Sequence, residues 1–175
     1  MKNINIQYFV EGEDEKKLVN VLKTELKMIR PGKVQKLNVV EEVITDAMLR
    51  PLKKDTIVVL IFDTDTKNVG ILNYNIMRLK ECNSVSKVIT IPQVANLEEE
   101  LVRSCDIKKI TELLGSPSLT DFKRDFIKIN NLDAKLTEHK FDINVFWSKR
   151  AKEPYQNIFN QSNEIKILTK KKTER

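Results

Sequence analysis

Three acidic residues stand where they could hold one metal ion. Glu11 follows an apolar segment and precedes Gly12, while Asp63 and Asp65 follow the most apolar segment of the chain. Side chains two residues apart on an extended chain point the same way. Carboxylates gathered at one place repel each other, and a hard cation such as Mg²⁺ or Mn²⁺ relieves that repulsion while keeping room for phosphate oxygens. The residue types therefore indicate phosphoryl chemistry at an open metal site.

The segments that must position these acids alternate between strand and helix. The patterns predict strands at residues 5–10, 33–40, 56–62 and 86–91, and helices at 14–28, 41–52, 70–82 and 96–114, the last broken near Asp106. The run at 56–62, Thr-Ile-Val-Val-Leu-Ile-Phe, is typical of the buried centre of a parallel sheet. This alternation predicts an α/β fold with a mostly parallel four-stranded sheet flanked by helices.

Such a sheet would bring the acids together. Ligands of open α/β sheets bind beyond the carboxyl ends of the strands, where Glu11 and Asp63 are expected. Gly12 permits a tight turn into the next helix, whose first N–H groups and positive dipole end attract a phosphate. Asp63 and Asp65 are alternatively turn-forming residues, but an acid directly after a buried strand favours a functional role.

The chain after the predicted core contains a second group of apolar residues. Ser118 is a good N-cap for a helix reaching about residue 130, in which Phe122 and Phe126 lie four positions apart. Phe146 and Trp147 belong to a later apolar cluster. We expect these four aromatic side chains to be buried. Residues 1–115 then form the α/β core, and residues 116–175 form a mainly helical extension packed on it.

Composition and charge narrow the classes of protein. The 175 residues are 41% hydrophobic and 32% charged, which predicts one globular core. No apolar run approaches the ~18–20 residues of a membrane helix and no signal region opens the chain, so a cytoplasmic protein is expected. Two cysteines and one histidine argue against a structural zinc site. The net charge of +6 fits a polyanionic partner, although part of it lies in residues 166–175, expected to be a solvated tail.

Two segments resemble the TOPRIM fold. Tyr8-Phe9-Val10-Glu11-Gly12-Glu13-Asp14-Glu15 resembles its motif of a hydrophobic strand followed by Glu-Gly-x-x-acid, and residues 57–65 resemble its motif of a hydrophobic strand followed by Asp-x-Asp. Gly70 is similar to the glycine that often follows, although it lies farther from Asp65 than in the compact form of the motif. The resemblance covers roughly residues 3–100. The zinc ribbon and second domain of a primase and the gate domains of a topoisomerase are missing, which favours stand-alone OLD-like or RloB-like nucleases.

The resemblance implies roles for the acidic residues. Glu11 would be a metal ligand or a general acid/base, and Asp63 and Asp65 would be metal ligands. Glu15 matches the second acidic position of the first motif, so it would bind the same ion or a second one.

Two later residues also match TOPRIM nucleases. Glu98 resembles an acidic residue near the fourth strand of OLD-like sites and would be a metal ligand. Glu99 stays an alternative to it, as does a solvated helix face for both. Lys149 is similar to a late lysine of OLD-type sites, which would neutralise charge on the phosphorane. The alternative for Lys149 is an ordinary surface lysine.

The resulting hypothesis is a Mg²⁺- or Mn²⁺-dependent nuclease that cleaves DNA or RNA, in phage defence or nucleic-acid processing, with a companion ATPase as a partner. One alternative is a non-catalytic module that binds nucleic acid or a nucleotide through the same acids. Another is a phosphoryl-transfer enzyme acting on a small nucleotide.

Overall fold

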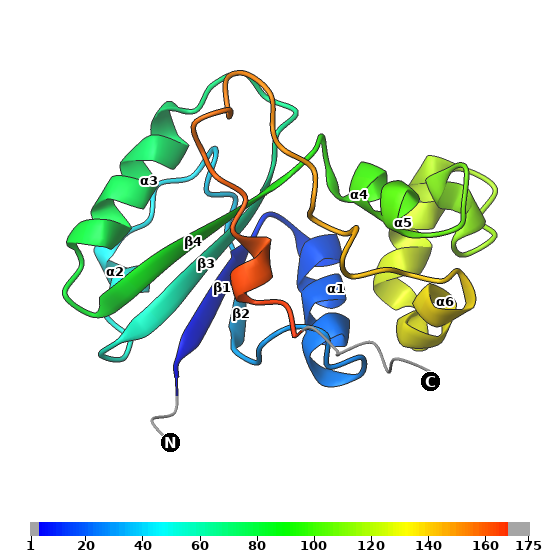
Figure 1. The fold of residues 1–175 in the computed structure, drawn as a ribbon, viewed down its shortest axis with the longest axis horizontal. Helices are drawn as coiled ribbons and strands as arrows, with labels where there is room; N and C mark the ends of the chain where they lie inside the picture. The colour runs from blue at the N-terminus through cyan, green and yellow to red at the C-terminus, as the bar shows by residue number, and fades with distance from the viewer. Residues whose placement is uncertain (1–3, 168–175) are drawn as a thin grey trace, which may run out of the picture.

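A four-stranded parallel sheet forms the centre of the molecule. The computed structural model describes residues 4–167. Its strands are β1 (Ile6–Val10), β2 (Lys33–Lys36), β3 (Thr56–Asp63) and β4 (Val85–Gln93). They pair in parallel in the order β2-β1-β3-β4 (Figure 1). The predicted α/β fold with a four-stranded parallel sheet is confirmed.

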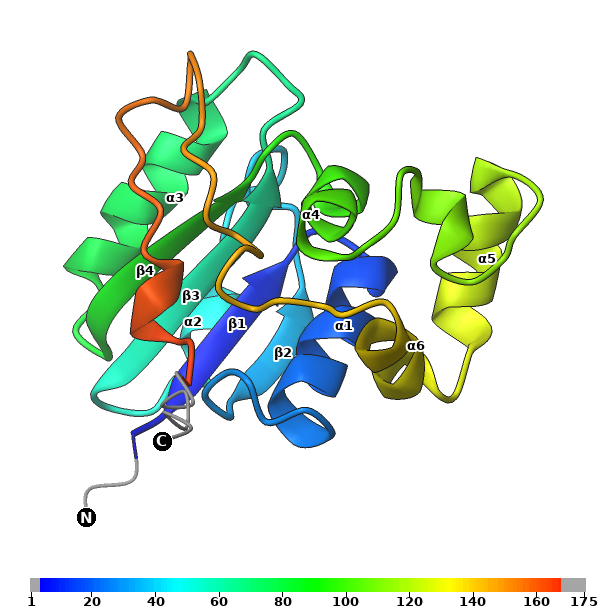
Figure 2. The same cartoon turned by 45° about the vertical axis from the view of Figure 1, so that its right-hand side comes forward.

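Helices cover both faces of this sheet (Figures 1 and 2). One face carries α1 (Glu13–Thr24), α4 (Leu97–Ser104), α5 (Leu119–Lys128) and α6 (Leu132–Glu138), and the other carries α2 (Asp46–Leu49) and α3 (Gly70–Glu81). Two short 3₁₀ helices complete the elements, η1 (Ile110–Glu112) and η2 (Ser162–Glu164). Alternate residues of β1 and β3 enter the two hydrophobic cores, so the apolar runs of these strands are buried on both sides.

The segment between β2 and β3 differs from the prediction. The strand expected at 33–40 ends at Lys36, and the helix expected at 41–52 is reduced to α2. The buried side chain of Asn75 explains the difference. Its Nδ2 donates to the carbonyl oxygens of Val39 (2.9 Å) and Glu42 (2.8 Å), and its Oδ1 accepts from the N–H of Ile44 (2.9 Å). These bonds engage backbone groups that a longer helix would use.

The helix expected at 96–114 is also shorter than predicted, because α4 ends at Ser104. The N–H of Asp106 donates to the carbonyl oxygen of His139 at 2.9 Å, and the N–H of Asp142 donates to that of Ser104 at 2.9 Å. These contacts with the chain after α6 replace a continuation of the helix. The break falls close to the predicted one.

The C-terminal region packs against the core. Phe122, Phe126, Phe146 and Trp147 are each at most 2% exposed, as predicted. The expected helical character is found in α5 and α6, and Ser118 caps α5 by accepting the N–H of Asp121. Residues 140–161 instead form turns and extended segments.

The last described residues cover part of the β4 edge of the sheet. Thr90 of β4 bonds to Gln161 through both backbone groups, with distances of 2.9 and 3.0 Å, which leaves less of this edge strand open to pairing. Lys166 is only 7% exposed and donates to the carbonyl oxygen of Phe146. A solvated tail beginning near residue 166 is therefore wrong for Lys166, while residues 168–175 lie outside the described part. Within residues 4–167, no helix combines the length and apolar character needed to cross a membrane.

Candidate active site

Glu11 and Asp63 meet at the carboxyl end of the sheet. Val10 is paired with Ile61, so the chain leaves two neighbouring strands at almost the same level. The backbone N–H of Asp63 donates to Glu11 Oε2 at 3.0 Å. The parallel strand order therefore brings together two acids that are 52 residues apart.

Gln93 contacts the side chain of Asp63 from β4, the strand on the opposite side of β3 from β1. It is fully buried at the end of β4 and lies opposite Asp63 in the strand register. Its Nε2 donates to Asp63 Oδ1 at 2.7 Å, and its Oε1 accepts from Trp147 Nε1 at 3.0 Å. The strand predicted at 86–91 ends before Pro92, whereas β4 continues to Gln93, a residue that was not predicted to belong to the site. The signal was available, because Gln93 also stands at the carboxyl end of a parallel strand.

Burial raises the pKa values of Glu11, Glu15 and Asp63. Burial raises the pKa of Asp63 to about 9, and the charges of Glu11 and Glu15 act in the same direction against the hydrogen bond from Gln93. Burial raises the pKa of Glu15 to about 7. Burial also raises the pKa of Glu11, opposed by the hydrogen bond from Asp63. The acids therefore hold protons tightly unless positive charge comes close.

Glu15 and Asp65 occupy different positions in this group. Glu15 is 7% exposed and its Oε2 accepts the N–H of Gly12 at 3.0 Å, so it also caps the start of α1. Asp65 is exposed, and its negative charge contributes to the raised pKa values of Glu11 and Asp63. Both acids act electrostatically on the Glu11 and Asp63 pair.

Glu98 is turned toward the acids, and Glu99 is not. The carboxylate of Glu98 pairs with the ammonium group of Lys123 at 3.2 Å, and its charge helps to raise the pKa of Glu11. Glu99 is exposed and its N–H is capped by the side chain of Asn96. Of the two alternatives that the sequence left open, Glu98 and Glu99, Glu98 is therefore the residue that lies near the other acids in this structure.

Glu100 has a separate, structural position. It is fully buried, and it accepts the N–H of Val94 at 2.9 Å and the N–H of Trp147 at 3.1 Å. Arg103 pairs with it at 2.8 Å. These contacts fasten the region after α6 to the carboxyl end of β4.

The lysine whose charge reaches the acids is Lys123 of α5. Glu98 is the main cause of its raised pKa, and Asp14 and Asp63 contribute. Lys149 is exposed, and within residues 4–167 it forms no ion pair. No local motif marked Lys123, because only the packing of α5 against α1 brings it to this end of the sheet.

The donor chemistry fits a hard cation. Glu11 and Asp63 each use one carboxylate oxygen in a hydrogen bond, and the second oxygen of each accepts none from the described residues. Carboxylate oxygens are the ligands that Mg²⁺ and Mn²⁺ favour. Among residues 4–167, however, no three His, Cys, Asp or Glu side chains are grouped closely enough to hold a metal ion as they stand. Two carboxylates are in place, and further ligands would have to turn toward them.

Comparison of the chain with protein-family models, curated proteins and solved structures gives no match. The resemblance to TOPRIM proteins therefore stays a hypothesis that rests on the two motifs.

Proposed function

We propose that this protein is a Mg²⁺- or Mn²⁺-dependent phosphodiesterase that cleaves nucleic acid. The observation that carries the proposal is the contact between Glu11 and the Asp63 backbone, 3.0 Å long, at the ends of adjacent parallel strands. It brings into one place two half-buried carboxyl groups whose pKa values are raised. A divalent cation beside them would favour their ionised forms and offset the electrostatic repulsion between the two carboxylates.

In this proposal Glu11 and Asp63 hold the ion, and Glu15, Asp65 and Glu98 supply further carboxylates near it. The bound ion would polarise the phosphodiester and neutralise the charge that develops on it. Gln93 orients Asp63 through its hydrogen bond of 2.7 Å, as an outer partner of a ligand does. Burial raises the pKa of Glu11, and a raised pKa favours a carboxyl group that exchanges a proton during the reaction.

The segment at 148–160 would bind the substrate. Lys149, Arg150 and Lys152 are exposed on it, and the ring of Phe159 is 71% exposed. The hydroxyl of Tyr155 lies 2.9 Å from that of Thr66, just after Asp65, so the segment reaches the loop that follows β3 (Figures 1 and 2). Cations and an exposed aromatic ring near an acidic site suit the backbone and bases of a single strand.

The compartment, the cellular process and the partner that we propose follow from the resemblance to OLD-like proteins. We place the activity in the cytoplasm, in nucleic-acid processing or phage defence, with a companion ATPase as partner. The acidic site and the basic segment support nucleic acid as the substrate, and the assay below compares DNA with RNA.

A cleavage assay tests the proposal. Single- and double-stranded DNA and RNA are incubated with the purified protein in Mg²⁺, in Mn²⁺ and in a chelator, with and without an ATPase encoded beside it. We expect cleavage only with a metal ion. Asp63→Ala and Glu11→Gln should lower the rate by about 10³-fold or more, because each removes charge from the site. Lys80→Ala, on the exposed side of α3, is the matched surface control.

Three results would contradict the proposal. Metal-dependent binding of nucleic acid without cleavage under any condition favours the non-catalytic module. Turnover of a mononucleotide alone favours small-molecule phosphoryl transfer. If Asp63→Ala cleaves as fast as the wild type, the site lies elsewhere. Thermal melts of all variants check that they are folded.

A further inference from the structure

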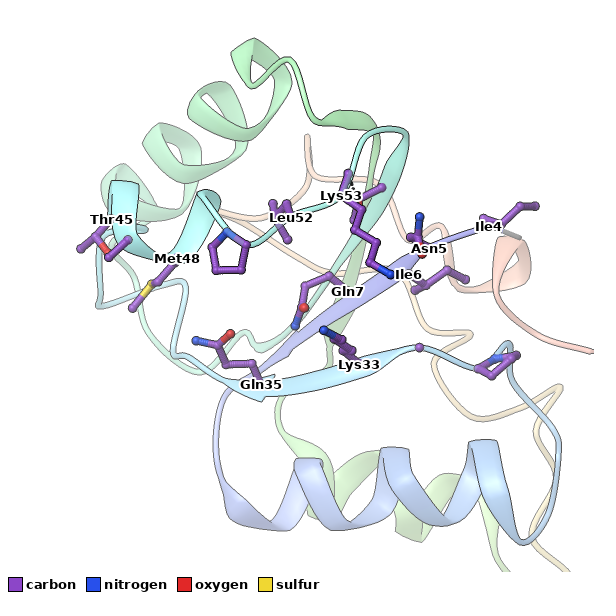
Figure 3. Close-up of a pocket in the computed structure, with 15 residues that line it drawn as sticks. Ile4, Asn5, Ile6, Gln7, Lys33, Gln35, Thr45, Met48, Leu52 and Lys53 are labelled. Carbon is purple, nitrogen blue, oxygen red and sulfur yellow. Dashed lines mark hydrogen bonds between the residues drawn. The ribbon is translucent and has the colours of Figure 1, made fainter. Parts of the chain in front are cut away.

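A second site is formed at the opposite, amino end of the sheet. A cavity of about 590 Å³ lies between β1 and β2 on one side and the segment at 45–53 on the other (Figure 3). Ile6 and Gln7 line it from β1, and Met48 and Leu52 line the facing wall. Its volume lies within the ~300–1,000 Å³ of small-molecule sites. None of the acids described above borders it.

The short helix α2 is the reason for this cavity. A helix over the whole of 41–52 would pack along β1 and β2, but α2 has only four residues. The hydrogen bonds of Asn75 hold the preceding segment in an irregular path. Pro51 and Leu52 then carry the chain away toward β3. Part of one sheet face is left without a covering helix.

Three residues with carboxamide side chains line this space, Asn5, Gln7 and Gln35. Gln7 is 8% exposed and its side chain points into the cavity (Figure 3). Its Nε2 donates to the carbonyl oxygen of Tyr8 at 3.1 Å, while its Oε1 accepts no hydrogen bond from the described residues. Gln35 extends into the same space from β2 (Figure 3). A ligand that covers these amides must hydrogen-bond them, because an unpaired buried amide costs free energy.

The charged groups that the described residues bring to the cavity are positive. Lys33 comes from β2 and Lys53 from the opposite wall, and no acidic side chain among residues 4–167 lines the cavity. Neither lysine forms an ion pair with a described residue. Unneutralised ammonium groups beside an apolar surface favour an anion that also has an apolar or planar body.

We propose that this cavity binds a nucleoside monophosphate. The base lies against Met48 and Leu52, its polar edge pairs with the amides of Gln7 and Gln35, and the phosphate lies between the two lysines. An alkyl carboxylate would satisfy the charge and the apolar wall but would leave both amides unpaired. A nucleobase carries donors and acceptors in its plane, so it satisfies all three features. This binding does not depend on the proposed nuclease activity.

Isothermal titration of the full chain in a chelator tests the proposal. The probes are adenosine 5′-monophosphate, ribose 5-phosphate, which lacks a base, and decanoate, which lacks hydrogen-bonding edges. We expect saturable binding of the nucleotide and affinities at least about tenfold lower for the other two. Gln35→Leu and Lys53→Ala should each weaken nucleotide binding about five- to tenfold. Both residues are exposed, so the variants should fold.

Two controls locate the binding. Lys80→Ala removes an exposed lysine from another surface and should not change the affinity. Asp63→Ala alters the acidic site and should also bind the nucleotide as the wild type does. The proposal is overturned if the nucleotide does not bind, if decanoate binds as tightly, or if Asp63→Ala loses binding that Gln35→Leu and Lys53→Ala retain.

Discussion

The two ends of strand β1 carry opposite chemistry. At its carboxyl end Glu11 contacts Asp63 in a group of acids with raised pKa values. At its amino end Gln7 faces a cavity whose charged side chains, among residues 4–167, are Lys33 and Lys53. In a parallel sheet, like ends of all strands lie together, so residues placed after the strands gather at one end and those placed before them at the other. One sheet can therefore support two separate sites.

The two ends also differ in what opposes their function. Burial and mutual repulsion of carboxyl groups destabilise the acidic end, and Gln93, Trp147 and Glu100 hold it in place. At the amino end the cost is a part of the sheet face, with the carboxamide of Gln7, that no helix of the described residues covers. Functional sites are commonly maintained at such a cost in stability. The predictions below separate the two ends.

The largest effect is expected from Glu100→Ala. This change leaves the buried N–H groups of Val94 and Trp147 and the guanidinium of Arg103 without their partner. The free energy of unfolding should fall by about 3 kcal/mol. Denaturant titration measures this loss, and Glu99→Ala, at an exposed position, is the control and should stay within about 0.5 kcal/mol.

Hydrogen exchange locates the damage in the same variant. Amides near Val94 and Trp147 should exchange faster, while those of β2 should keep their protection. Equal loss of protection at both ends of the sheet would show that the two ends do not behave as separate units.

Gln93→Leu is expected to have a smaller effect than Glu100→Ala, and this effect is on the rate of cleavage and its pH dependence. The change removes the hydrogen bond that lowers the pKa of Asp63, so that pKa should rise further. Cleavage at pH 7 should fall about tenfold, and the pH at which activity appears should move upward. A purely structural role would lower activity equally at every pH, and an unshifted pH profile would exclude the positioning role. Thermal melts report the accompanying loss of the Trp147 contact.

The metal-free protein should become less stable as the pH rises. Folding raises the pKa of Asp63 from 3.8 to about 9 and that of Glu15 from 4.5 to about 7. Between these values the folded state binds more protons than the unfolded state, so stability is highest at the acidic end and is lost as the pH increases. Melting temperatures from pH 5 to 9 should fall less steeply for Asp63→Asn. Mg²⁺ should restore stability mainly at high pH, and parallel curves for the two proteins would contradict the shift.

The smallest effect concerns the basic segment. Lys149→Ala combined with Arg150→Ala should weaken single-stranded nucleic-acid binding several-fold and reduce its salt dependence by about one unit of slope or slightly more. Nucleotide binding in the cavity at the amino end should not change. Fluorescence anisotropy at several salt concentrations measures the slope. An unchanged slope would mean that these cations do not contact phosphate.

Local sequence patterns determined the framework of the molecule. The apolar run at 56–62 is typical of the centre of a parallel sheet, and the alternation of strands and helices indicated the fold class. Once the strands were parallel, the position of Glu11 and Asp63 directly after two of them was enough to bring them to the same end. The aromatic pair Phe122 and Phe126 likewise followed from helical spacing.

Tertiary structure decided the features that depend on contacts between distant residues. Asn75 lies more than 30 residues from the backbone it bonds, and it shortens the expected helix and thereby leaves the cavity. Lys123 reaches Glu98 only through helix packing, and Gln93 is held by Trp147, 54 residues away. Periodicity and capping act within a few residues, whereas these hydrogen bonds and ion pairs form only once the packed core brings their partners within bonding distance.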